Sequence, residues 1–442
     1  MIFHATSLVV AALVAFSAVV NSRAAEMFTV HYPPSKQPGE LAVEATYHLW
    51  IPPTAKRVRA VIVHQHGCGE GAENSGETAA LDLHWRALAA RHDCALLSPH
   101  YRALNGNCRL WCEPRNGSDL VFQRALADLA KESGHPEIST APWCLWGHSG
   151  GGFWASLMLE KHPERIVAVF CRSGTAMMGL GKPEIAPLNY PPAAFGVPVV
   201  LNPGVEERGH AQFNGAWTGS LQFFEQFRSK GAPVAFAPDP FSSHDCRNSR
   251  LLAIPFFDAC LRQRLPRRGA MLRAVRQSDG FVGDWTTGRM RSAGTLTNEL
   301  SWLPDETCAR AYSEYVTTGV TTDRTPPMKA PRLTAVTRDL VSGGITLEWT
   351  AEADFESGVR QFAIYRDGVL LARLPEKLND RAGFAQFQTI SFHDTPVPDA
   401  PPLRFIDQTA PADARPSYAV AVINGAGMEG PRSKAIKPAA RR

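Results

Sequence analysis

Hydrophobic and polar positions alternate along the first 265 residues in a way that predicts strands and helices in turn. Apolar runs typical of strands cover residues 41–51, 59–64, 94–98, 143–146, 166–171, 197–201 and 233–237. Between and after these runs, the patterns typical of helices lie at residues 84–91, 119–131, 153–161, 222–230 and 251–262. Strands that alternate with helices indicate an α/β fold, in which helices cover both faces of a mainly parallel sheet.

The pattern changes after residue 265. Residues 266–324 are rich in Arg, Gly and Thr around one predicted helix at 304–316, and are expected to form a connector. Thr325-Pro-Pro then marks a boundary. Short alternating strands follow at 332–336, 345–350, 361–366, 369–373, 403–406 and 418–423. Together with the Asp367-Gly368 hairpin turn, they predict an all-β sandwich over residues 325–442.

The N-terminus has the features of a signal peptide, expected to span residues 1–25. Leu8 to Val20 is an apolar stretch, and the small residues after it suit cleavage near Ala24 or Ala25. The first domain would then cover residues 26–265. No other window holds about 18 uninterrupted apolar residues, so no membrane span is expected in the mature chain. We therefore expect a secreted or periplasmic protein.

Charge and cysteine content narrow the partners and the covalent links. Lys and Arg total 46 against 42 Asp and Glu, without a long run of like charge, so no nucleic-acid partner is predicted. The 9 cysteines are an odd number, which leaves at least one thiol unpaired. In an exported chain disulfides are expected. The spacing offers Cys108 with Cys112 and Cys246 with Cys260 as candidate pairs.

No cofactor and no metal ion is predicted. Cys-x-x-Cys pairs and a His-Glu-x-x-His run are missing from the chain. His64 and His66 end a predicted strand and are expected to be structural rather than a pair of metal ligands.

One serine stands in a distinctive setting. Gly147-His148-Ser149-Gly150-Gly151 lies between a predicted strand and a predicted helix and matches Gly-x-Ser-x-Gly. In this nucleophile elbow a strained turn lifts the serine hydroxyl above the sheet, and the glycines prevent clashes. Ser149 is the predicted nucleophile.

A serine nucleophile needs a base, and the elbow's fold places it last in the order Ser, acid, His. His244 follows the last predicted strand of the sheet and is the predicted base. His210 is an alternative, but it lies after an earlier strand, where the acid is expected. His162, beside a proline at a helix end, is expected to be a surface residue.

The acid is expected after the strand at 197–201. Glu207 is preferred there, Glu206 is the alternative, and either would fix the tautomer of the imidazole and stabilise its positive charge. Asp239 and Asp245 are the remaining candidates, although Asp245 directly follows His244 and is poorly placed to face its ring.

The oxyanion hole is expected to combine two backbone amides. One is that of Gly150, after the nucleophile, and the other is that of Cys68 in His66-Gly-Cys-Gly. Cys68 as a thiol nucleophile is disfavoured because it lacks an obvious base.

Residues 40–265 resemble the alpha/beta-hydrolase family. His66-Gly-Cys-Gly and Gly147-His-Ser-Gly-Gly look like the secreted esterases related to polyhydroxybutyrate depolymerases and feruloyl esterases. The resemblance implies Ser149 as nucleophile, His244 as base and Glu207 as acid, although such esterases more often have Asp as the acid.

The C-terminal segment is similar to a fibronectin type III domain. Trp349 would be the core tryptophan and Tyr418 the corner tyrosine, and Tyr365 is also expected to pack in the core. Such modules usually serve as spacers or adhesion units, so the expected partner is a polymer or a cell surface.

The leading function is that of a secreted serine esterase acting on a small or polymeric ester. A peptidase on the same fold and a non-catalytic surface-binding protein are the alternatives. Trp111, Trp217 and Phe241 are candidates to line an apolar substrate pocket, and core packing is the other interpretation of the same residues.

Overall fold

The computed structural model describes residues 27–69, 71–103, 107–179, 187–266, 271–294, 299–339, 343–381, 383–397, 402–411 and 414–438. The predicted signal peptide lies outside the described residues.

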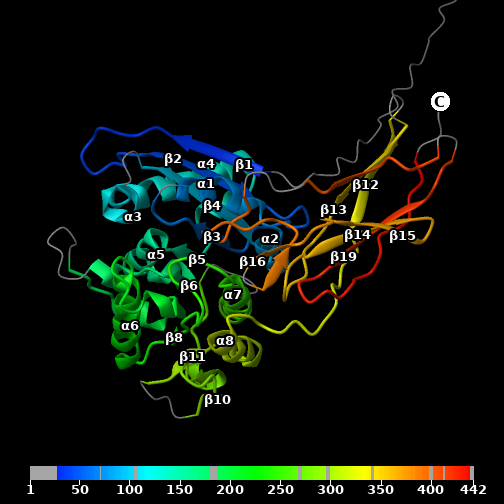
Figure 1. The fold of residues 1–442 in the computed structure, drawn as a ribbon. Coiled ribbons are helices and arrows are strands. Elements are labelled where there is room, and N and C mark those ends of the chain that lie inside the picture. The colour runs from blue at the N-terminus through cyan, green and yellow to red at the C-terminus, as the bar shows by residue number, and fades with distance from the viewer. Residues whose placement is uncertain are drawn as a thin grey trace, which may run out of the picture.

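An eight-stranded sheet forms the centre of the large domain, in the order β1-β2-β4-β3-β5-β6-β7-β8 (Figure 1). The strands are β1 (Met27–Tyr32), β2 (Glu44–Trp50), β3 (Val61–Gln65), β4 (Ala95–Arg102), β5 (Trp143–His148), β6 (Ile166–Arg172), β7 (Val199–Asn202) and β8 (Val234–Phe236). β2 pairs antiparallel with β1 and β4, and β3 to β8 run parallel. This strand order is that of the alpha/beta-hydrolase fold and confirms the predicted fold class.

Helices cover both faces of this sheet because each strand sends alternate side chains to opposite sides. On β5, Trp143 and Leu145 join one hydrophobic core, and Cys144 and Trp146 join the other. The helices of this domain are α1 (Ala72–Thr78), α2 (Leu83–Arg91), α3 (Arg109–Cys112), α4 (Ser118–Ser133), α5 (Gly150–Lys161), α6 (Asn214–Ser229) and α7 (Arg250–Arg264). Residues of α4, α5 and α6 pack in the first core, and those of α2 and α7 in the second.

The connector forms more structure than its sequence predicts. Besides the expected helix, here α8 (Glu306–Thr318), it contains the strands β9 (Phe281–Gly283), β10 (Met290–Ser292) and β11 (Ser301–Leu303), which form a small sheet. Tyr312 of α8 donates a hydrogen bond of 2.8 Å to the carbonyl of Phe236 in β8. This contact packs the connector on the large domain.

The C-terminal domain is a β-sandwich, as predicted. Its two antiparallel sheets have the orders β12-β13-β18 and β15-β14-β19. The strands are β12 (Arg332–Arg338), β13 (Ile345–Thr350), β14 (Gln361–Arg366), β15 (Val369–Leu374), β18 (Arg404–Asp407) and β19 (Tyr418–Ile423), with β16 (Asn379–Arg381) and β17 (Phe384–Gln386) as a separate pair. Trp349 and Tyr418 lie in the core between the sheets, and Tyr365 is also buried.

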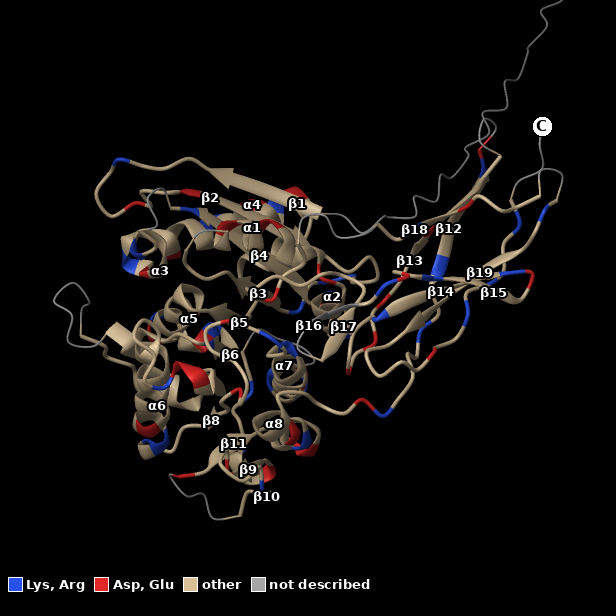
Figure 2. Cartoon of the chain, viewed as in Figure 1, with Lys and Arg blue, Asp and Glu red and all other residues tan. Residues whose placement is uncertain are grey.

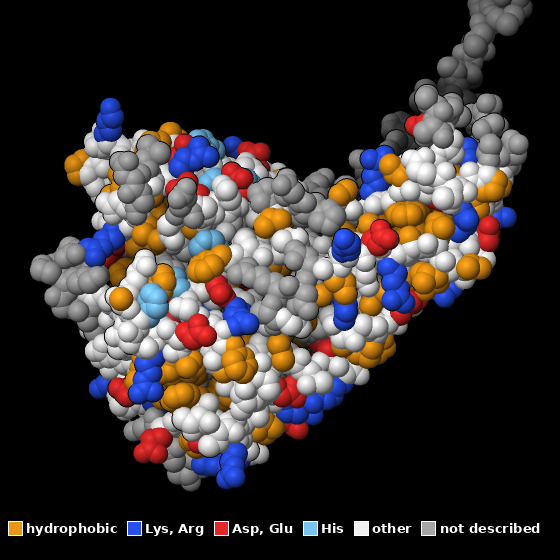
Figure 3. Space-filling model, in the orientation of Figure 1, with side chains coloured by type: hydrophobic (Ala, Val, Ile, Leu, Met, Phe, Trp, Pro, Cys, Tyr) orange, Lys and Arg blue, Asp and Glu red, His pale blue; other side chains and the backbone are white. Residues whose placement is uncertain are grey.

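Charged residues of both signs occur in both domains. In Figure 2, Lys and Arg positions are mixed with Asp and Glu positions along the ribbon, in keeping with a formal net charge of +4. Figure 3 shows histidine side chains beside hydrophobic ones on one face of the large domain.

Candidate active site

Ser149 occupies a strained turn between β5 and α5. Its φ of 54° and ψ of −115° are unusual for a residue with a side chain, and such strain persists only where the surroundings enforce it. The surroundings leave no room for side chains at the neighbouring glycines. A Cβ on Gly147 would lie 2.2 Å from the carbonyl oxygen of Gly151, and one on Gly174 would lie 2.1 Å from that of Ser149. The turn therefore has the geometry expected of a nucleophile elbow.

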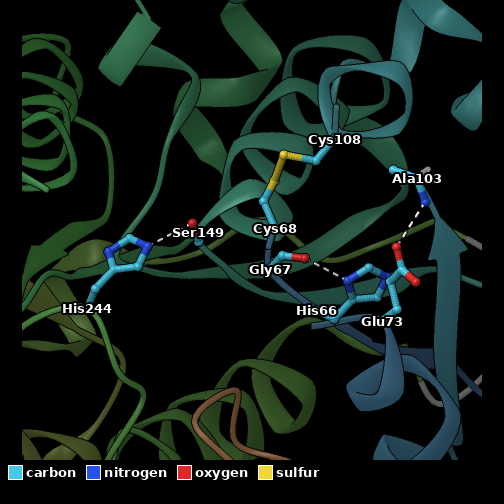
Figure 4. The surroundings of a disulfide bond; sticks show 8 residues. All are labelled: His66, Gly67, Cys68, Glu73, Ala103, Cys108, Ser149 and His244. Atoms are coloured by element: carbon cyan, nitrogen blue, oxygen red, sulfur yellow. Dashed lines mark hydrogen bonds between the residues drawn. A yellow bond between two sulfur atoms is a disulfide. The ribbon is translucent and has the colours of Figure 1, made fainter. Parts of the chain in front are cut away.

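The structure brings Ser149, His244 and Glu207 together in one hydrogen-bonded chain. His244 Nε2 lies 2.8 Å from Ser149 Oγ (Figure 4), and His244 Nδ1 lies 2.6 Å from Glu207 Oε1. Glu207 ends a short 3-10 helix after β7, is 0% exposed, and also accepts a hydrogen bond of 3.0 Å from the amide of Gly204. The carboxylate can only accept, so Nδ1 carries the proton and Nε2 is free to accept the serine proton.

The other sequence candidates for base and acid point elsewhere. Glu206 is exposed, and His210 is exposed and stacks on Phe213. Asp239 accepts a hydrogen bond of 2.9 Å from the hydroxyl of Tyr315. The ring of His244 bonds to Ser149 and Glu207 instead.

Asp245 and His162, which the sequence analysis also considered, do not bond to the ring of His244 either. Asp245 uses its backbone carbonyl to accept from Arg172, and its carboxylate is not bonded to the His244 ring. His162 is half-buried and bonded to Asp119 at 2.9 Å, so it is less exposed than predicted.

The predicted oxyanion loop lies directly against the elbow. A Cβ on Gly150 would lie 2.2 Å from Cys68 Sγ, and one on Gly67 would lie 3.3 Å from Ser149 Cβ. Cys68 forms a disulfide with Cys108, just before α3, and Figure 4 shows this bridge beside Ser149. The two amides expected to form the oxyanion hole therefore belong to neighbouring residues.

His66 anchors the same loop from within. Its Nδ1 lies 2.7 Å from the carbonyl oxygen of Gly67 and its Nε2 accepts from the amide of Tyr101 at 3.0 Å. Burial lowers the pKa of His66 to about 3, so the ring is neutral and can donate at one nitrogen and accept at the other. This structural role agrees with the sequence expectation.

Neither of the two candidate disulfide pairs forms. Cys112, Cys246 and Cys260 are buried and take part in no disulfide. Cys112 points into the core, and Cys260 lies ten residues into α7, about 15 Å along the helix. Cys108 bonds instead to Cys68, 40 residues away. The disulfide also excludes Cys68 as a thiol nucleophile in this state.

The three pocket candidates have different settings. Trp111 is buried and would lie 3.5 Å from a Cβ on Gly150, so it borders the elbow. Trp217 packs in the core against Phe236, and Phe241 is 54% exposed.

Sequence patterns missed two residues that hold His244, the candidate base. Phe213 stacks on the His244 ring with centroids 4.1 Å apart. Arg172 is fully buried, donates to Ser242 Oγ at 2.7 Å and to the carbonyl oxygen of Ser243 at 3.0 Å, and so fixes the loop before His244. A buried arginine at the end of a strand has no sequence signal apart from its unusual polarity there.

Comparison with known proteins gives a limited result. No protein-family model and no curated protein sequence matches this chain significantly. Among solved structures it is similar to a thermostable esterase, at 15% identity and a TM-score of 0.34, with 48% of this chain and 54% of the other covered. It is also similar to an S-formylglutathione hydrolase from Agrobacterium tumefaciens, at 17% identity and a TM-score of 0.38, with 53% and 93% covered. A ferulic acid esterase is similar at 17% identity and a TM-score of 0.35, with 50% and 92% covered.

The chain spans about half the length of the thermostable esterase. Because all three TM-scores are below 0.5, the function has to be inferred from the site itself. Among the described residues, no helix combines the length and hydropathy needed to cross a membrane.

Proposed function

We propose that this protein is a serine hydrolase that cleaves carboxylic esters with Ser149, His244 and Glu207. The observation that carries the proposal is the continuous hydrogen-bonded chain from Ser149 Oγ through His244 to the buried carboxylate of Glu207. The strained backbone at Ser149 adds support, because such strain is typical of functional sites.

The reaction would proceed through an acyl-enzyme. Ser149 Oγ attacks the ester carbonyl while its proton passes to His244 Nε2, and Glu207 stabilises the imidazolium that forms. The amides of Cys68 and Gly150 would stabilise the negative oxygen of the tetrahedral intermediate. His244 then gives the proton to the leaving alcohol as the C–O bond breaks. Water, deprotonated by His244, then attacks the acyl-enzyme. As the bond between the acyl carbon and Ser149 Oγ breaks, the imidazolium returns this proton to Oγ, so the acid is released and Ser149 and His244 are regenerated.

The test is turnover of short-chain p-nitrophenyl esters by the full chain and by Ser149→Ala. The substitution should lower kcat by at least about a thousandfold, because a triad acts as a unit. Ser229→Ala is the matched control, since Ser229 is exposed at the end of α6 and its hydroxyl bonds only within its own helix turn. Equal turnover by the wild type and Ser149→Ala would refute the proposal. The matching p-nitroanilides separate an esterase from a peptidase.

We also propose that the protein is exported. The apolar N-terminal stretch and the Cys68–Cys108 disulfide support this, because disulfides persist mainly in oxidising compartments. Expression with the native N-terminus in a secreting host should yield a mature protein that begins near Glu26. A protein retained in the cytoplasm with residues 1–25 intact would contradict export.

The C-terminal domain is proposed to be of the fibronectin type III kind and to contact a polymer or a cell surface. Two antiparallel sheets around the buried Trp349 support the first part. Sedimentation of the Ser149→Ala protein with insoluble polyester particles tests the second part, and a protein that stays in solution would contradict it.

A further inference from the structure

The C-terminal domain reaches the proposed active site through one loop. Residues 387–397 extend from the sandwich onto the large domain, where the orange part of the chain lies beside α2 and α7 (Figure 1). The side-chain carbonyl of Gln388 accepts from the amide of Leu83 at 2.8 Å. Further along, the carbonyl of Phe392 accepts from the amide of Cys246 at 3.0 Å, two residues after His244.

The tip of this loop is fixed by a buried ionic contact. Asp394 is 0% exposed and pairs with Arg250 Nε at 2.7 Å, and it accepts from Trp85 Nε1 at 2.9 Å. Its φ of 62° shows that the surrounding contacts enforce a left-handed backbone there. His393 stands between the anchored Phe392 and the anchored Asp394, so its position is determined from both sides.

His393 contacts the elbow through His148, the residue before the proposed nucleophile. The Nδ1 atoms of His393 and His148 lie 2.9 Å apart. On its other side, His148 Nε2 lies 2.6 Å from the carbonyl oxygen of His244. A chain of two hydrogen bonds therefore leads from the C-terminal domain to the backbone of the proposed base.

The donors in this chain follow from the chemistry of the groups. The carbonyl of His244 can only accept, so His148 Nε2 carries a proton. Burial, and then the nearby His393 and His244, hold the pKa of His148 well below its usual range, so the ring is neutral and its Nδ1 has a lone pair. His393 must therefore donate from Nδ1 to His148.

The position of the His244 backbone matters because its ring has to meet two partners at once. The Nε2 to Ser149 and Nδ1 to Glu207 distances are 2.8 and 2.6 Å, and both depend on where the backbone of this loop residue sits. A shift of about 1 Å in such a group can cost about a hundredfold in rate. A hydrogen bond to the carbonyl of the same residue restricts that shift.

We propose that His393 of the C-terminal domain is a positioning residue for hydrolysis: it orients His148, which in turn holds the backbone of His244. The sandwich is then part of the active site rather than an appended module. This inference rests on the proposed hydrolase function.

The experiment compares two substitutions in the full chain, assayed beside the wild type and Ser149→Ala. His393→Phe keeps the ring and removes the donor, and should lower kcat by about 10- to 100-fold with little change in KM. His393→Asn places an amide N–H near the position of Nδ1 and should recover most of the lost kcat. Gln388→Ala is the matched control, because it removes a contact of the same loop that leads away from the elbow to Leu83.

The outcomes separate the two proposals. Loss of turnover in Ser149→Ala together with unchanged kcat in His393→Phe would overturn the positioning role and leave the hydrolase proposal intact. Equal loss in His393→Phe and Gln388→Ala would also overturn it, since the effect would then belong to the interface in general. Turnover that does not depend on Ser149 would instead refute the hydrolase.

A second measurement does not require the variants to fold. NMR of the wild type with 15N-labelled histidine should show His393 protonated at Nδ1 and His148 at Nε2. Protonation of His148 at Nδ1 would overturn the proposal, because that ring could not accept from His393.

Discussion

Replacing Glu207 by Gln removes the charge of the proposed acid and keeps the shape of its side chain. Glu207 Oε1 lies 2.6 Å from His244 Nδ1, and the side chain of Glu207 is fully buried, so bulk water does not screen the interaction between the two groups. Two unit charges centred about 4 Å apart interact by about 4 kcal/mol at an effective dielectric constant near 20. About 1.4 kcal/mol corresponds to a factor of ten in rate. Losing about 4 kcal/mol of stabilisation of the His244 imidazolium should therefore lower kcat about a thousandfold.

The tautomer of His244 adds to this loss. In Glu207→Gln the side-chain carbonyl of the new amide can still accept from the amide of Gly204, and its NH2 group then faces Nδ1 and forces the imidazole proton to Nε2. A ring protonated at Nε2 donates to the serine and cannot take its proton. The corresponding change in a Ser-His-Asp triad costs about ten-thousandfold, so the expected loss lies between about 10³ and 10⁴.

Glu206 supplies the matched control for this assay. Glu206→Gln removes the same charge one residue earlier, from an exposed side chain, and should leave kcat within about twofold of the wild type. The variants are compared by p-nitrophenyl ester hydrolysis at pH 8, with thermal unfolding to verify that both are folded. A Glu207→Gln protein that keeps a tenth of the wild-type kcat, or an equal loss in both variants, would refute the assignment of the acid.

Three further predictions concern the frame of the site and the second domain. Cys108→Ser opens the loop of 40 residues closed by the bond to Cys68; urea unfolding should show a loss of about 4 kcal/mol, and kcat should fall because the oxyanion loop is released. Gly147→Ala places a Cβ 2.2 Å from a backbone oxygen and should lower the free energy of unfolding by about 1–3 kcal/mol in the same assay. Burial, and then the charge of Asp323, raise the pKa of Asp354 from 3.8 to about 7. Asp354 thus stays protonated to a higher pH in the folded state than in the unfolded state. Its contribution to the free energy of unfolding is full below pH 4 and is lost as the pH rises to 7. Tm measured from pH 4.5 to 8 should therefore fall less steeply for Asp354→Asn than for the wild type.

Continuous apolar strands could be predicted from the sequence, and marginal elements could not. The strands at the centre of the sheet are buried on both faces, so their hydrophobic runs stand out, as in β5 and β6. β1 is an edge strand whose side chains alternate between exposed and half-exposed up to the buried Tyr32, and no such run marks it. α1 has the sequence AENSGET, which lacks an apolar stripe, and its Gly76 instead packs directly on the backbone of β4 at His100.

In the candidate site, too, residues in local sequence patterns could be predicted, and contacts between residues far apart in the sequence could not. The Gly-x-Ser-x-Gly turn is local, and the order of acid and base follows from the predicted strands, so Ser149, Glu207 and His244 could all be selected from the sequence. The contact between His148 and His393 joins residues 245 positions apart, and no local pattern encodes it. The disulfide partners were missed for the same reason, because pairing by proximity in sequence ignores which way each side chain points.

These long-range contacts explain how the strained turn at Ser149 can persist. A positive φ at a residue with a side chain costs free energy, so contacts from the surrounding structure have to hold the backbone in this conformation. The disulfide loop presses on one side of the elbow at Gly150, and the C-terminal loop holds His148 on the other. Arg250 makes the second constraint a rigid one, since it pairs with Asp394 of the sandwich and also with Asp82 of the large domain at 2.8 Å. Removing the sandwich would take away Asp394 from Arg250 and His393 from His148. If the proposed positioning role holds, the β-sandwich therefore helps to hold the strained turn of the proposed nucleophile.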